Sequence, residues 1–165
     1  MITGDEAGFD AFVQARSAAL WRTAYLLTGD HHLAQDLVQA ALVQAARHWE
    51  RIETSPEAYV RRTMYHQNIS WWRRRKLAET PLQSYDAPVP AADPTVRLTL
   101  EQALRRLTPR QRTVLVLRYF EDLTEVRTAA ELGISSGAVK SMSRQALQRL
   151  RVLAPELADL VGADV

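Results

Sequence analysis

Cysteine is absent from the 165 residues of this chain. Disulfide bonds and thiolate metal sites are therefore excluded, which suits a protein of the reducing cytoplasm. No apolar run approaches the roughly 20 residues needed to cross a bilayer. The acidic, polar start MITGDEAGFD is not typical of a signal peptide. We therefore expect a cytoplasmic protein without membrane insertion.

The familiar catalytic motifs are missing as well. There is no phosphate-cradling glycine loop, no HExxH, no CxxC and no glycine-framed serine nucleophile. The histidines, His31, His32, His48 and His66, show no spacing that would gather them around a metal. We therefore expect no enzyme activity, no metal site and no cofactor.

The composition that remains is typical of helices. Alanine, leucine, arginine and glutamine are abundant, and alternating β-branched runs are not found. Because 47% of the residues are apolar, one domain or two small ones could bury a core. The sequence therefore predicts an all-α protein.

Charge is unevenly distributed along the chain. The net charge of +2 says little, but residues 61–76 carry 6 bases and no acid. Residues 140–151 carry 4 bases and no acid, whereas residues 1–60 carry 8 acids and 4 bases. Two basic segments indicate two contacts with a polyanion, although solvated helix faces would give the same pattern.

The stretch LTEVRTAAELGISSGAVKSMSRQALQRL, residues 123–150, predicts a helix-turn-helix. Thr124 can cap a first helix, Gly133 can end it in the left-handed conformation, and Ser135 can cap a second. The outward positions of the second helix are small or basic, as major-groove binding requires: Ser136, Gly137, Lys140, Ser141 and Arg144. An ordinary αα-hairpin with a solvated basic face is the alternative.

Two amphipathic helices are expected near the start, at about 7–28 and 31–49. Thr28, Gly29 and Asp30 separate them with a stop signal and a new cap. The second helix has an apolar side and an unusually uncharged other side, formed by Gln35, Asp36, Gln39, Val43 and Gln44. That side could dock on a partner; periodicity alone favours a buried or half-buried helix in a small bundle.

A third helix is expected from a start signal at Ser55 and Pro56 to about Lys76. It interleaves aromatic residues with arginines, an arrangement that suits single-stranded nucleic acid because bases stack on rings while cations follow phosphates. Tryptophan is more often core, so at least one of Trp71 and Trp72 is expected to be buried.

Four prolines within residues 79–95 indicate an extended linker. An amphipathic helix from Val96 to Leu107 follows, then a capping box at Thr108 and Gln111 and a helix at about 109–120. The sequence thus predicts a helical domain at 1–78, a linker at 79–95, a helix-turn-helix domain at 96–154 and a short tail at 155–165.

This order of elements resembles the extracytoplasmic-function (ECF) sigma factors, and most of all their SigE-type branch. The segments DHHLAQDLVQAALVQAARHW (30–49) and LRRLTPRQRTVLVLRYFEDLTEVRTAAELGISSGAVKS (104–141) carry the resemblance, which extends from about Phe9 to Leu153. It implies a first domain of the region-two type and a second of the region-four type, without regions one and three.

The resemblance also implies partners: core RNA polymerase, through the clamp helices of its large subunit and its flap, and promoter DNA. Many members bind an anti-sigma factor too, for which this sequence has no local motif. Core-polymerase binding is implied for Asp36, Leu37, Gln39 and Leu42. Contacts with minus-10 DNA are implied for Trp49, Tyr59, Arg62, His66, Trp72, Arg73, Arg74, Arg75 and Lys76. Contacts with minus-35 DNA are implied for Arg112, Ser136, Gly137, Lys140, Ser141 and Arg144.

Some positions depart from the family pattern. Gln35 and Ala40 stand where many members have acids, so the polymerase contact should be less electrostatic. Arg127 replaces a usual glutamate, and Met142 an expected arginine. We expect Met142 to face inward, which leaves base contacts to Lys140, Ser141 and Arg144. His66 and Ser70 likewise differ from the common residues of the basic helix.

Two other functions fit parts of the sequence. A stand-alone helix-turn-helix regulator could dimerise through the N-terminal bundle, but it would not need the aromatic and basic helix. An enzyme or ligand-binding bundle with a DNA-binding tail would need the catalytic groups that the sequence lacks.

Overall fold

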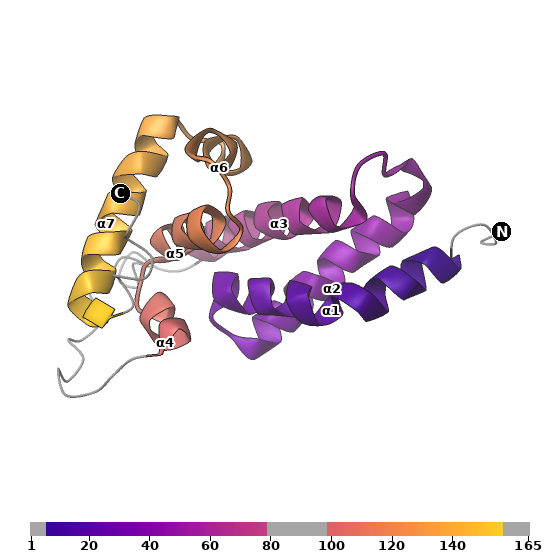
Figure 1. Cartoon of the computed structure of the whole chain (residues 1–165), viewed down its shortest axis with the longest axis horizontal. Coiled ribbons are helices and arrows are strands. Elements are labelled where there is room, and N and C mark those ends of the chain that lie inside the picture. Colours follow the sequence, from indigo (N-terminus) through magenta and orange to yellow (C-terminus); the bar gives the residue numbers. More distant parts are fainter. Residues whose placement is uncertain (1–5, 79–98, 157–165) are drawn as a thin grey trace. The chain divides into compact units, whose positions relative to one another are not determined.

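The computed structural model describes residues 6–78 and 99–156, and all of their regular structure is helical (Figure 1). The chain divides into two compact units between Trp71 and Trp72. None of the described helices is both long and apolar enough to cross a membrane. The predicted linker at 79–95 lies outside the described residues.

The first unit is built on α1 (Glu6–Thr28), α2 (His31–His48) and α3 (Pro56–Ala78) as far as Trp71, with a short 3₁₀ turn, Trp49–Arg51, after α2. These bounds agree with the expected helices. Gly29, at φ 69°, ends α1 with a 2.8 Å hydrogen bond from its N–H to the Tyr25 carbonyl. Asp30 then begins α2, because its carboxylate accepts a 2.9 Å bond from the Leu33 amide.

The core of the first unit forms where α1 and α2 pack together (Figure 1). Its fully buried side chains include Leu20, Leu27, Leu37, Val60 and Met64. Polar contacts join α3 to α1. Arg61 donates from Nη1 to the Thr23 hydroxyl at 2.7 Å and pairs with Glu57 at 2.9 Å, and Glu57 also pairs with Arg16 at 3.4 Å.

The second unit contains α4 (Leu100–Arg105), α5 (Pro109–Leu115), a π-helical turn (Val116–Phe120), α6 (Glu125–Leu132) and α7 (Ser136–Leu153). The expected capping box is present: the Thr108 hydroxyl accepts from the Gln111 amide, and the Gln111 side chain accepts from the Thr108 amide. α7 packs against α5 and α6. Val114, Leu117, Val139 and Leu150 are fully buried in this core.

Three details differ from expectation. The helix expected from Val96 is described only as α4, which begins at Leu100; residues 96–98 lie outside the description. The helix expected at 109–120 changes to a π-turn at Val116. Neither Trp71 nor Trp72 belongs to the buried core, so the expectation that one of them anchors the bundle was wrong.

Candidate nucleic-acid interface

The turn between α6 and α7 has the geometry of a helix-turn-helix. Thr124 caps α6 by accepting a 3.0 Å bond from the Arg127 amide, and Gly133 ends it at φ 68°. The Ile134 amide then bonds back to the Ala129 carbonyl at 3.1 Å. Ser135 caps α7 by accepting a 3.0 Å bond from the Ala138 amide. Every cap expected from the sequence is formed.

The start of α7 offers an exposed face without acids. All the predicted outward residues are exposed: Ser136, Gly137, Lys140, Ser141 and Arg144. The opposite side is buried through Val139, Ser143, Ala146 and Leu147. A rigid, capped helix of this kind can present a cation and hydroxyls to the base edges of a major groove.

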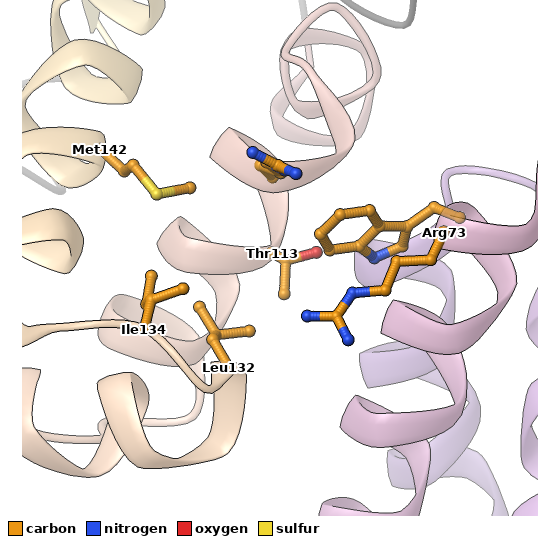
Figure 2. A pocket seen from close by; sticks show the side chains of 7 residues that line it. Arg73, Thr113, Leu132, Ile134 and Met142 are labelled. Carbon is orange, nitrogen blue, oxygen red and sulfur yellow. The ribbon is translucent and has the colours of Figure 1, made fainter. Parts of the chain in front are cut away.

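Met142 does not lie on that face. It is half-buried, and its side chain lies on a hollow that Leu132, Ile134 and Thr113 also line (Figure 2). The thioether is therefore turned inward, as expected. Arg112, the remaining predicted minus-35 residue, is half-buried on α5.

One ionic contact on α6 was not foreseen. Arg127 donates from Nε to Glu131 Oε1 at 3.2 Å, and the Glu131 side chain is only 4% exposed. The spacing of four residues on a helix was a signal that could have revealed this pair.

On α3, the basic residues lie at the surface more than the aromatic ones. Arg62, His66, Arg73 and Arg74 are exposed. Tyr59, Trp72 and Arg75 are half-buried, and the Lys76 side chain lies outside the description. The helix thus combines exposed cations with partly accessible rings.

Trp49 lies in an aromatic cluster with Phe9 and Phe12. Its ring centroid is 5.2 Å from that of Phe9, edge-on, and 5.5 Å from that of Phe12. These contacts tie the loop after α2 to the start of α1. Trp49 is half-buried and supports the 49–55 loop, and its contact with DNA stays a prediction.

α2 has two different sides. Leu37 is fully buried and Leu42 is 8% exposed, so both belong to the core of the first unit. The uncharged side is open to solvent along its length: Gln35, Asp36, Gln39, Val43 and Gln44 are all exposed. The surface available to a partner is therefore formed by Asp36, Gln39 and Val43, with the two leucines beneath it. The sequence placed Val43 on this side of α2, but the family resemblance did not name it as a contact residue.

Two protein-family models match this chain. The Sigma-70 region 2 model covers residues 12–77, and the Sigma-70 region 4 model covers residues 103–152. The RNA polymerase sigma-E factor of Streptomyces coelicolor is 42% identical over 156 residues, which span 90% of this chain and 86% of that protein. The chain belongs to the ECF RNA polymerase sigma factors.

Other relatives agree with this assignment. The ECF RNA polymerase sigma factor SigL of Mycobacterium tuberculosis is 33% identical over 159 residues, 89% of either chain. The fold of this ECF sigma factor also resembles that of the sigma factor RpoE from Bartonella quintana, solved with the anti-sigma factor NepR. The TM-score is 0.63 at 23% identity, and the match covers 88% of this chain and 96% of that one.

The described residues of the sigma factor contain no group of three or more histidines or acids that could hold a metal ion. Among the described acids, Asp30 has a lowered pKa, and it is a helix cap. The Leu33 amide, which donates to the Asp30 carboxylate, holds the pKa of Asp30 below its ordinary value; the amide and ring of His32 and the ring of His31 act in the same direction, and desolvation opposes them. Its interactions are those of a helix start, not of a reaction centre.

Proposed function

We propose that this ECF sigma factor binds core RNA polymerase and directs it to promoters by contacting minus-10 and minus-35 DNA. The observation that carries the proposal is the exposed, acid-free start of α7 on a fully capped helix-turn-helix. In this proposal the protein acts in the cytoplasm and catalyses no reaction itself.

The minus-35 contact rests on α7. A helix lying in the major groove reads bases with side chains near its start. Lys140 and Arg144 are exposed one turn apart and can donate to guanine acceptors, and Ser141 lies between them. Gly137 leaves room for close approach of the helix to the DNA.

The minus-10 contact rests on α3 and on the loop before it. Melting a base pair takes a few kcal/mol, which an enzyme or initiation factor recovers by stacking the freed base in a pocket. Tyr59 supplies a partly accessible ring near the start of α3, and Arg73 and Arg74 supply cations near its end. We assign base stacking to Tyr59 and backbone binding to the two arginines.

The polymerase contact rests on the uncharged side of α2. Asp36, Gln39 and Val43 are exposed there, and Val43, at 48% exposure, provides an apolar centre. A helix face of this composition suits a helical partner surface such as the clamp helices. An anti-sigma partner stays a prediction from the resemblance; in the Bartonella quintana structure, RpoE is bound to NepR.

Transcription reconstituted from purified parts tests the proposal. The full chain is mixed with core polymerase and a genomic template library, and transcript starts are mapped. Specific starts that depend on the chain are expected. Absence of starts together with failure to co-purify with polymerase would refute the sigma function. A footprint on duplex DNA without polymerase would instead favour the stand-alone regulator.

A further inference from the structure

Arg127 and Glu131 form an ion pair on the first helix of the helix-turn-helix. Nε of Arg127 lies 3.2 Å from Oε1 of Glu131; the arginine side chain is 60% exposed and the glutamate side chain 4%. A buried carboxylate thus fixes the base of an exposed guanidinium. The side chain of Arg127 is held on α6 through Nε while most of it remains exposed.

Helix stability does not explain this pair. Arg127 is in the first turn of α6, near the positive end of the helix dipole, and Glu131 is in the last turn, near the negative end. Arginine preceding glutamate at this spacing is also the weaker of the two orders. Burial of a carboxylate also carries a desolvation cost, against which an ion pair with a mostly exposed cation contributes little.

The pair lies next to the element that would enter DNA. Glu131 is two residues before Gly133, the residue that ends α6, and five before the start of α7. The ion pair draws the guanidinium along α6 toward this turn. In helix-turn-helix proteins the first helix crosses the phosphate backbone while the second lies in the groove. A cation fixed at this point is therefore expected to face a phosphate.

We propose that Arg127 is a DNA-backbone contact of the minus-35 interaction and that Glu131 is its positioning residue. The terminal nitrogens of a guanidinium match the geometry of two phosphate oxygens, and orienting the group beforehand reduces the entropy lost on binding. Such a contact sets register without reading bases. The inference rests on the proposed sigma function and adds a residue to that site.

The test measures the affinity of holoenzyme, assembled from the full chain and core polymerase, for one genomic promoter fragment that the wild-type holoenzyme selects. Affinity is measured over a range of salt concentrations for Arg127→Gln, Arg127→Lys and Glu131→Gln. Arg22→Gln is the matched control, because Arg22 is an exposed arginine on α1, outside both basic segments. Thermal unfolding of each free variant is recorded in parallel.

Arg127→Gln should lower affinity about tenfold and reduce the slope of log affinity against log salt by about one. Arg127→Lys should keep the slope and recover part of the affinity. Glu131→Gln retains the cation, so it should keep the slope while lowering affinity about threefold, because the guanidinium is no longer fixed. Arg22→Gln should change neither quantity by a similar amount.

An unchanged salt slope in Arg127→Gln would overturn the inference, and a lowered unfolding temperature in the same variant would then mark the pair as structural only. This conclusion stands even if Glu131→Gln does not fold, because Arg127 is exposed. Failure of the wild-type holoenzyme to select any promoter fragment would be a different result: it would refute the proposed sigma function itself.

Discussion

At the scale of single residues, two left-handed backbone positions frame α6. Asp122, at φ 56°, turns the chain after the π-helical turn, and Gly133, at φ 68°, ends α6 before α7 begins. Left-handed conformations are costly for most residues; glycine adopts them readily, and aspartate does so more often than most other side chains. The direction in which α7 leaves the turn therefore depends on one glycine.

Gly133→Ala should lower the free energy of unfolding by about 1–2 kcal/mol. The open space around a Cβ at this position means that the loss comes from backbone strain and not from a clash. Gly137→Ala is the matched control: Gly137 is helical, and its Cβ would meet only the Ser135 hydroxyl, at 3.9 Å. Because alanine favours helices, this change should stabilise by up to about 1 kcal/mol. Urea unfolding measures both, and equal effects would contradict the strain argument.

Asp30 predicts a pH dependence of stability. Its pKa is lowered in the folded state by the Leu33 amide, so the folded protein binds a proton at this carboxylate more weakly than the unfolded chain does. The resulting stability is fully present above the ordinary aspartate pKa of about 3.9 and is lost as pH falls through the lower folded value.

Asp30→Asn should therefore remove a pH-dependent part of the stability while keeping a helix cap, because asparagine caps nearly as well. The difference in unfolding temperature between the wild type and this variant is expected to shrink as pH falls from about 6 to about 3. Asp10→Asn, at an exposed position within α1, is the control. A difference that stays constant with pH would count against the cap carboxylate as its source.

At the scale of the elements, the sequence predicted helices well because most signals are local. The caps at Asp30, Thr108, Thr124 and Ser135 lie where their residue types indicate, and each forms its expected hydrogen bond. A second capping box at Thr99 and Gln102 has the same spacing and was missed, although the signal was visible. Because the apolar pattern begins at Val96, the helix was predicted to start earlier than α4 does, at Leu100.

Other features could not be predicted from local patterns. The π-turn at Val116–Phe120 depends on how Val116 and Leu117 fit the core, where both are fully buried. The Leu123 amide bonds to the Leu117 carbonyl across it at 2.9 Å. Similarly, the packing of Trp49 against Phe9 and Phe12 joins residues 37 or more positions apart in the sequence, and no spacing rule predicts such a contact.

In the candidate site, too, some features could be predicted from local sequence patterns and others could not. Exposure of the α7 residues followed from helical periodicity, because Val139 and Leu147 define the buried side. Periodicity also placed Leu37 on the apolar side of α2, yet the family resemblance named it as a contact residue. Burial of Leu37 makes it a support for the exposed residues above it.

Because Val43 is exposed and Leu37 is buried on α2, polymerase binding and folding stability can be tested separately. Val43→Asp adds a charge to an exposed position, so unfolding should change by less than about 0.5 kcal/mol while co-purification with core polymerase falls at least about tenfold. Ala18→Asp, exposed on α1, is the control and should retain polymerase. Leu37→Ala should instead lower the free energy of unfolding by about 2–5 kcal/mol. Full retention of polymerase by Val43→Asp would contradict the proposed surface.

At the scale of the whole molecule, the proposed function divides DNA binding between two helices of one chain. The two basic segments lie on α3 and on α7, and the same polypeptide joins them. Once one contact forms, covalent connection raises the effective concentration of the other. Neither contact then needs high affinity alone, and their salt dependences should add because each releases counterions from phosphates.

Because the salt dependences of the two DNA contacts should add, removing one contact should lower the total salt slope by the share of that contact. Arg73 and Arg74 are both exposed on α3, so Arg73→Gln with Arg74→Gln should reduce the salt slope of promoter opening by about two and slow opening at physiological salt. Arg22→Gln with Arg47→Gln removes the same charge from exposed positions on α1 and α2 and should leave the slope nearly unchanged. The measurement is open-complex formation by reconstituted holoenzyme between about 50 and 200 mM salt. Equal slopes for the two double variants would mean that net charge, and not a contact made by α3, governs the salt dependence.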